Sequence, residues 1–152
     1  MSRELLDQAG FPDPDGSGPG MRFTLSYKTS QDELGKRIAA ALQQQLKQVG
    51  IGLTIRSYEW GTFYGDIKSG NFQLYALSWV GVTDPDIYDY IFHSKNFPPA
   101  GANRGRYANP EVNALLESAR RTLDLTRRKE YYVRVQEILA RDLPYVSLWH
   151  YD

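Results

Sequence analysis

The feature that most constrains the fold is an alternation of strand-like runs with helical segments. The strand-like runs are residues 21–27 (MRFTLSY), 51–57 (IGLTIRS) and 72–79 (FQLYALSW). A long amphipathic helix is predicted between the first two runs and a short one, residues 60–68, between the last two, and Gly50 and Gly70 favour helix ends there. Strands joined through helices normally lie parallel in one sheet. The chain is therefore predicted to be an α/β protein with a mainly parallel sheet flanked by helices.

Capping signals set the expected starts of the longer helices. Ser30, with Glu33 three residues later, forms a capping box before a helix whose apolar stripe is Leu34, Ile38, Leu42, Leu46 and Val49. Asn109 followed by Pro110 is typical of a second helix start. The last helix, residues 126–140, carries a stripe made of Tyr131, Val135, Ile138 and Leu139.

At 152 residues the chain has the length of one ordinary domain. Residues 1–20 are predicted to be the end of a helix and a Pro/Gly-rich linker from a preceding segment, since GFPDPDGSGPG follows a short helical pattern. Residues 21–152 are predicted to form one α/β lobe. Within it, a short helix is expected in residues 84–92 and a last strand in residues 145–150 (YVSLWH).

Composition excludes several function classes. Eighteen basic and eighteen acidic residues give a net charge of zero, so no nucleic-acid partner is expected. The chain has no cysteine and no phosphate loop, and its two histidines, His93 and His150, form neither a metal-binding pair nor a Ser-His pattern. No metal and no organic cofactor is therefore expected. No apolar run approaches the roughly 20 residues that span a bilayer, and Met1–Gly10 lacks the apolar stretch of a signal peptide.

Aromatic and acidic side chains follow the predicted strands. Ligands of open parallel α/β sheets lie outside the carboxyl ends of the strands, where the connecting loops gather. Tyr58 and Trp60 follow the second strand, and Trp79 and Asp84 follow the third. Each indole offers a flat surface with one N–H donor, which suits side chains of varied shape. The alternative for either tryptophan is packing in the core.

The charged candidates each have a structural alternative. Asp84 and Asp86, in VTDPDIYDY, either contact a ligand or cap the short helix. Together with Glu59 they also suggest a glycosidase acid pair, although their spacing does not favour it over a binding cleft. Arg104 and Arg106, in ANRGRY, suit a carboxylate or phosphate, or they are solvated loop charges.

Six segments in order resemble the C-terminal lobe of the extracellular solute-binding proteins of the oligopeptide, dipeptide and nickel-binding family. These segments are ELLDQAGF, QQQLKQVGIGLTI, EWGTFYGDIKSGNFQLYALSWVG, DPDIYDYIFHS, NRGRYANPEVNALLESAR and RRKEYYVRVQEILARDLPYVSLWH. The resemblance covers nearly the whole chain.

The resemblance implies a periplasmic or extracytoplasmic protein of two lobes that close on a peptide or similar small solute and deliver it to an ABC permease. It also implies that residues 21–152 are part of a ligand-binding lobe, that the protein is a monomer, and that it is not an enzyme. Trp60 and Trp79 fall where the aromatic residues of such sites commonly occur. Tyr58, Asp84 and Arg104 are the other expected solute contacts.

One position departs from the family pattern. Many peptide binders carry an aspartate three residues after the tryptophan of the third loop, where it pairs with the free amino group of the ligand, and here that residue is Val82. Either Asp84 supplies the charge, or the ligand lacks a free amine. A carboxylate-based hydrolase domain and a protein-interaction domain without a solute site are the alternative functions.

Overall fold

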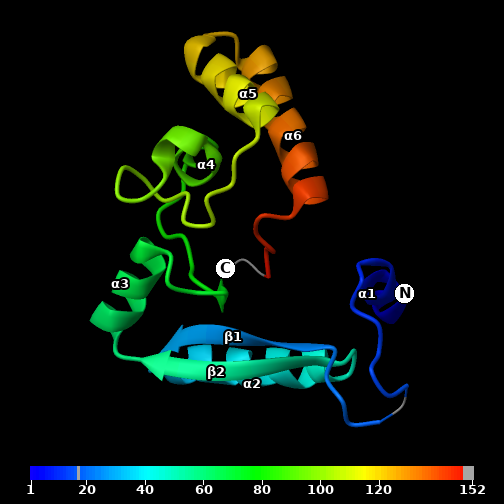
Figure 1. The fold of residues 1–152 in the computed structure, drawn as a ribbon. Helices are drawn as coiled ribbons and strands as arrows, with labels where there is room; N and C mark the ends of the chain where they lie inside the picture. The colour runs from blue at the N-terminus through cyan, green and yellow to red at the C-terminus, as the bar shows by residue number, and fades with distance from the viewer. Residues whose placement is uncertain (17, 149–152) are drawn as a thin grey trace. The chain divides into compact units, whose positions relative to one another are not determined.

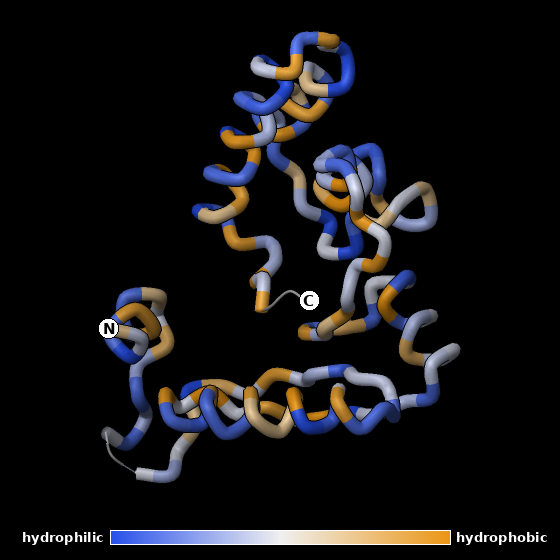
Figure 2. The backbone as a smooth tube through the Cα atoms, turned by 180° about the vertical axis from the view of Figure 1, so that it is seen from behind, coloured by the Kyte–Doolittle hydropathy of each residue, from blue (hydrophilic) through white to orange (hydrophobic). Residues whose placement is uncertain are grey.

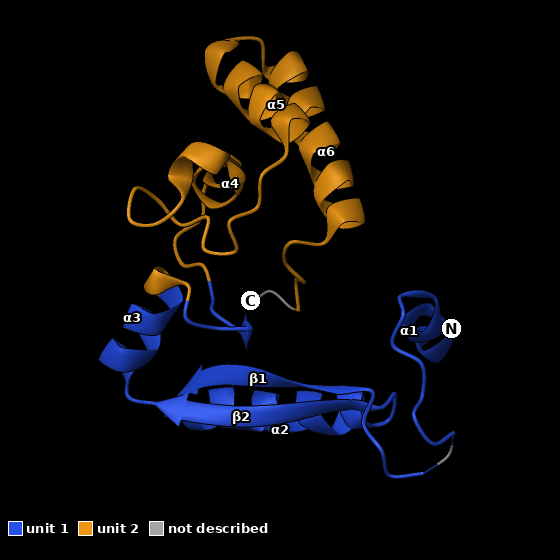
Figure 3. Cartoon of the chain, in the orientation of Figure 1, with its two compact units in different colours: residues 1–67, 71–78 blue, residues 68–70, 79–152 orange. Residues whose placement is uncertain are grey.

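A computed structural model describes residues 1–16 and 18–148 of the chain (Figure 1). The chain divides into two compact units, which Figure 3 colours separately. The first unit comprises Met1–Ile67 and Asn71–Ser78, and the second comprises Lys68–Gly70 and Trp79–Asp152. Each unit has its own set of contacts and is described by itself.

The first unit is built on a parallel sheet of three strands. β1 (Phe23–Ser30) lies in the middle, between β2 (Ile51–Tyr58) and β3 (Leu74–Tyr75). β1 and β2 pair along their full length, and two crossover helices, α2 (Glu33–Lys47) and α3 (Trp60–Ser69), connect the strands. The predicted α/β class and the parallel pairing of the first three strands are confirmed.

One face of this sheet packs against α2. The buried side chains of this small core are Tyr27, Ala39 and Leu53, with Leu25, Leu42, Leu46, Ile55, Leu74 and Ala76 partly buried around them. Leu42 and Leu46 belong to the predicted stripe, whereas Leu34 is exposed and lies outside the core. The Nε2 of Gln43 also donates to the carbonyl of Leu53 at 2.6 Å, which ties the helix to β2.

The start of α2 differs from the predicted capping box. Ser30 is the last residue of β1, and Asp32 is the N-cap, where its Oδ1 accepts the amide N–H of Gly35 at 2.6 Å. The hydroxyl of Ser30 donates to the carboxylate of Asp32. These hydrogen bonds, that of Ser30 first and that of Gly35 second, hold the pKa of Asp32 below its ordinary value. The prediction of Ser30 as the cap was wrong because β1 extends to that residue and leaves the capping position to Asp32.

The third strand is shorter than predicted. The predicted strand covers residues 72–79, but only Leu74–Tyr75 pairs with β1. The Oε1 of Gln73 accepts both the amide N–H of Ser26 at 2.7 Å and its hydroxyl at 2.9 Å. A side chain thus takes a position that a backbone carbonyl would occupy in a longer ladder, and the ladder ends there.

The N-terminal segment is held by one buried arginine. α1 (Ser2–Gln8) precedes the Pro/Gly connector, and Arg22, at the end of that connector, pairs with Asp7 and with Asp13 (3.7 Å). Arg22 is almost fully buried and also donates to the carbonyl of Phe11. The helix and the connector are therefore attached to the first unit by specific polar contacts.

The second unit is helical. It contains α4 (Ile87–Phe92), the short 3-10 helix η1 (Ser94–Asn96), α5 (Pro110–Arg121) and α6 (Leu125–Asp142). As predicted, Asn109 caps α5, since its Oδ1 accepts the amide N–H of Glu111 at 2.9 Å, and Pro110 is the first helical residue. Asp124 caps α6 in the same way.

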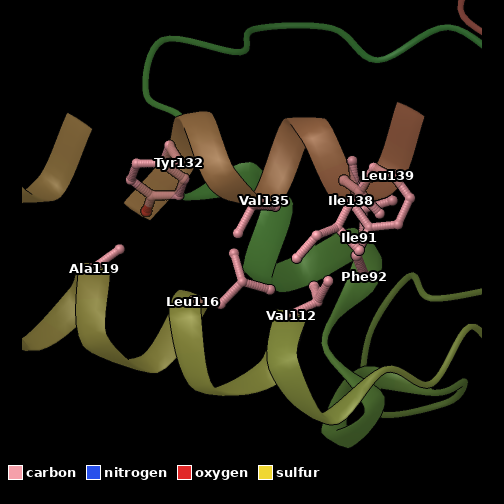
Figure 4. Close-up of a cluster of buried hydrophobic side chains, with 9 residues drawn as sticks. All are labelled: Ile91, Phe92, Val112, Leu116, Ala119, Tyr132, Val135, Ile138 and Leu139. Carbon is pink, nitrogen blue, oxygen red and sulfur yellow. The ribbon is translucent and has the colours of Figure 1, made fainter. Parts of the chain in front are cut away.

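A single apolar cluster holds the helices of this unit together (Figure 4). Its buried members are Ile91, Phe92, Val112, Leu116, Ala119, Tyr132, Val135, Ile138 and Leu139. Apolar positions recur along α5 and α6 at helical spacing (Figure 2). The predicted stripe of α6 is confirmed, since Val135, Ile138 and Leu139 are buried and Tyr131 is partly buried against the cluster. Tyr132, which was not predicted, is buried there as well and meets the ring of Tyr88 on α4.

The chain after α6 does not form the predicted strand within the part that is described. Leu143 ends the helix in the left-handed conformation, with φ of 48°, and residues 145–148 have no strand partner. The rest of the predicted strand, residues 149–150, lies outside the described residues.

Candidate functional site

The first candidate surface lies at the carboxyl end of β2 and consists of Tyr58 and Trp60. Tyr58 is the last residue of β2 and is half-buried. The Nζ of Lys28, on the neighbouring β1, lies 5.3 Å from the centre of the Tyr58 ring and donates to Asp66 at 2.6 Å. The hydrogen bond from Lys28, with a second from Asn71, holds the pKa of Asp66 below its ordinary value. The charges of Lys28 and Asp66, beside Tyr58, are therefore paired within the unit.

Trp60 is the first residue of α3, and its side chain is 58% exposed. Its indole stacks on the ring of Tyr64, one helical turn later, with 5.5 Å between ring centres and 7° between planes. Phe63, which is buried, supports the ring from a second side at 5.9 Å. Trp60 thus presents a flat aromatic face on a rigid helix start and does not pack in the core.

Glu59 has a structural role beside Trp60. Its carboxylate accepts the amide N–H groups of Gly61 (2.7 Å) and Thr62 at the start of α3. The hydrogen bonds of Thr62, followed by that of Gly61, hold the pKa of Glu59 below its ordinary value. An ionised cap of this kind is unlike the protonated carboxyl that a glycosidase acid requires.

The second candidate surface lies after β3 and centres on Trp79, whose side chain is 39% exposed. The ring of Tyr90, on α4, meets the indole edge-on with 6.4 Å between centres. The guanidinium of Arg104 lies 5.1 Å from the centre of the Trp79 ring, although 25 residues separate the two in the chain. The structure therefore brings two of the predicted site residues, Trp79 and Arg104, together.

A buried asparagine positions Arg104. Asn103 is 1% exposed, its Nδ2 donates to the carbonyls of Phe92 (3.2 Å) and Tyr107 (2.7 Å), and its Oδ1 accepts the amide N–H of Tyr107 at 2.9 Å. These bonds hold residues 103–107 as a tight turn against the end of α4. Arg104 itself is only 9% exposed, so its position against Trp79 is well determined by packing.

Asp84 is paired with an arginine that the sequence did not point to. Arg128, on α6, donates from Nη2 to Oδ1 at 2.6 Å and from Nη1 to Oδ2 at 3.1 Å. Oδ1 also accepts the amide N–H of Asp86 at 2.7 Å, which confirms the predicted role of Asp84 in starting the short helix. The bonds from Arg128 are the main reason that the pKa of Asp84 lies below its ordinary value.

The other charged candidates also have partners. Asp86 pairs with Arg120 at 3.1 Å and accepts the hydroxyl of Tyr132 at 3.3 Å. Arg106 is exposed, has a φ of 53°, and lies 6.0 Å from the centre of the Phe97 ring.

The five predicted site residues thus fall in two groups. Tyr58 and Trp60 belong to the first unit, and Trp79, Asp84 and Arg104 to the second.

Sequence reasoning missed Tyr64, Tyr90 and Arg128. Tyr64 follows Trp60 by four residues on a predicted helix, so the spacing alone indicates a stacked pair. Arg128 lies 44 residues from Asp84, and no local pattern signals that contact.

The described residues hold no group of side chains suited to a metal ion. His93 is buried, with Nε2 3.3 Å from Glu117 and Nδ1 accepting the amide N–H of Lys95 at 3.1 Å. His150 lies outside the described residues. Across residues 1–16 and 18–148, no set of three or more histidine, aspartate or glutamate side chains is arranged to hold a metal ion. Within the same residues, no helix combines the length and the apolar character needed to cross a membrane.

Comparisons with known proteins agree on one family. Residues 1–99 match the profile of the bacterial extracellular solute-binding proteins, family 5, middle segment. The oligopeptide-binding protein AppA of Bacillus subtilis (strain 168) is 30% identical over 98% of this chain. The probable deoxycholate-binding periplasmic protein YgiS of Escherichia coli (strain K12) is 30% identical over 99% of it.

The fold agrees as well. The structure of AppA from Bacillus subtilis in complex with a nonapeptide matches 95% of this chain with a TM-score of 0.83. The chain spans only 28% of the length of AppA and 26% of that of YgiS. The similarity therefore covers nearly all of this chain but less than a third of either relative.

Proposed function

The chain belongs to the bacterial extracellular solute-binding proteins of family 5, and on this basis we propose that it contributes one lobe of a binding protein that captures peptides or similar small solutes for an ABC importer. The observation that carries the proposal is the match, along almost the whole chain, to a relative solved with a bound nonapeptide. Residues 21–152 are the proposed lobe, and residues 1–20 the segment that leads into it.

The two exposed tryptophans are the proposed solute contacts. A large indole left uncovered on a helix start or a rigid loop is typical of a binding surface, because its apolar area is stabilised only when a partner covers it. Trp60 and Trp79 meet this description, and both are supported from behind by other aromatic rings. Tyr58 is proposed to contact a solute beside Trp60, and Arg104 is proposed to contact a solute where its guanidinium lies over the Trp79 ring.

Asp84 remains a proposed contact with a modified role. Its carboxylate is exposed and lies five residues after Trp79, so a solute at this loop is within reach of it. Arg128 holds both of its oxygens, however, and the solute therefore meets a neutral ion pair at this point.

The protein is proposed not to be an enzyme. Glu59, Asp84 and Asp86, the acids that the hydrolase alternative would use, cap a helix or pair with arginines. An ionised, hydrogen-bonded carboxylate is a poor general acid at neutral pH. Release of a chromophore from nitrophenyl glycosides or peptide anilides by the purified protein would favour the hydrolase alternative.

The location and the partners follow from the same proposal. The complete protein is proposed to act outside the cytoplasmic membrane, as a monomer, and to deliver its solute to permease subunits. Association with detergent-solubilised permease encoded by neighbouring genes, in the presence of solute, tests the partner directly.

Solute binding itself is tested by thermal denaturation of the complete protein with mixed-sequence di- to nonapeptide libraries. Ligands that bind only the folded state raise the melting temperature, by mass action. We expect a rise for the wild type and a smaller rise for Trp60→Ala and Trp79→Ala. Leu125→Ala, which removes an exposed apolar side chain at the start of α6, is the matched control and should behave as the wild type. Equal rises in all four proteins would contradict the site, and no rise in any of them would contradict peptide capture.

A further inference from the structure

The loop after β3 presents apolar side chains to solvent. Val80 is 92% exposed, and its chain neighbours Trp79 and Val82 are exposed as well. The exposed Tyr90 lies against the indole of Trp79. We call these four residues the third-loop surface. Exposing the two valines to water is unfavourable, and an apolar partner stabilises them by removing their surface area from water.

The carboxylates that follow this surface are neutralised by the protein itself. Both oxygens of Asp84 accept hydrogen bonds from Arg128. Asp86 pairs with Arg120 at 3.1 Å, and the buried Asp89 accepts from the same guanidinium at 3.0 Å and from the Nζ of Lys95 at 3.0 Å. An ammonium group brought to this loop therefore meets carboxylates whose charge is already compensated.

The Trp79 ring already has a cation of the protein over it. The guanidinium of Arg104 lies over that ring at 5.1 Å and is held there by packing, since Arg104 is nearly buried. Removing an ammonium from water without a paired carboxylate is costly.

We propose that the part of the solute lying against the third-loop surface is apolar and carries no ammonium group. This inference rests on the proposed function, because it takes Trp79 as a solute contact. Two kinds of solute share this chemistry: peptides whose amino terminus is blocked, and amphipathic carboxylates that contain no amine.

The test compares three probes on the complete protein by isothermal titration calorimetry. The probes are a mixed-sequence tripeptide library with free amino termini, the same library after N-acetylation, and sodium deoxycholate. We expect the acetylated library or deoxycholate to bind at least as tightly as the free-amine library. If the free-amine library binds about tenfold tighter than both others, the inference is wrong while the proposed function stands. If no probe binds at about 1 mM, both are wrong.

Substitution of Arg128 tests the physical reason. Arg128→Gln leaves Asp84 as an uncompensated carboxylate. It should strengthen binding of the free-amine library relative to the acetylated library by about five- to tenfold, as expected for one charge-assisted hydrogen bond near the surface. Arg128→Lys keeps the positive charge and should retain the wild-type ratio. Arg134→Gln, on the same helix but paired with Glu111 and Glu137, is the control for loss of an α6 arginine. An unchanged ratio in Arg128→Gln, with melting temperature preserved, would overturn the inference.

Discussion

Replacing Trp60 with alanine should weaken solute binding roughly 20-fold and leave the protein folded. A tryptophan side chain offers about 250 Å² of surface, so the 58% that is exposed corresponds to about 140 Å². Covering half of that area at about 25 cal/mol per Å² contributes about 1.7 kcal/mol, which is roughly a 20-fold change in the dissociation constant.

The effect on folding has a calculable ceiling. The remaining 42% of the side chain, about 105 Å², is already covered by the unit, chiefly by Tyr64 and Phe63. Its loss costs at most about 2.6 kcal/mol, and about 2 kcal/mol after allowance for the compactness of the unfolded chain. Alanine at this first helical position also favours α3, which offsets part of the cost.

Calorimetric titration at 25 °C with the tripeptide pool that binds the wild type most tightly gives the change in the dissociation constant. Urea denaturation of the same variant gives the change in the free energy of unfolding. Leu125→Ala is again the control, since it removes exposed apolar area outside the candidate site. A Trp60→Ala protein that binds within twofold of the wild type, yet has lost about 2 kcal/mol of stability, would show that Trp60 is a structural residue.

Three further predictions concern the fold of the complete protein. Asp89→Ala should lower the free energy of unfolding by about 2 to 3 kcal/mol in urea denaturation, because it leaves the half-exposed Lys95 and Arg120 without their buried partner. A loss below about 0.5 kcal/mol would contradict this. Burial, and then the hydrogen bond to Asp142, raise the pKa of Tyr107 to about 12, so the stability that Tyr107 contributes is complete below pH 10 and is lost as the pH rises through 12. The free energy of unfolding, measured between pH 9 and 12, should therefore depend less steeply on pH in Tyr107→Phe than in the wild type. An unchanged slope would contradict this. Asp32→Ala should lower the free energy of unfolding by about 1 kcal/mol, because it removes a helix cap, and Ser30→Ala should lower it less. Thermal melts in which Ser30→Ala is the less stable variant would contradict this.

Some features of the fold depend on neighbouring residues and others on residues far apart in the chain. The parallel pairing of the strands and the Asn109 cap could both be predicted, because polarity patterns and capping chemistry are properties of neighbouring residues. The bounds of β3 could not be predicted in this way. The start of the strand depends on the Gln73 side chain meeting the amide of Ser26, a contact across 47 residues.

The charge state of the candidate site was likewise decided by tertiary structure. The sequence alone determined that aromatic and acidic side chains would follow the strands, and it left open whether Asp84 offered a free negative charge. The packing of α6 brings Arg128 to both oxygens of Asp84, and a buried asparagine turn brings Arg104 to Trp79. Residue type determines which charges a chain carries, but only the folded arrangement determines which of them are already neutralised, because ion pairs form between side chains that lie far apart in the chain.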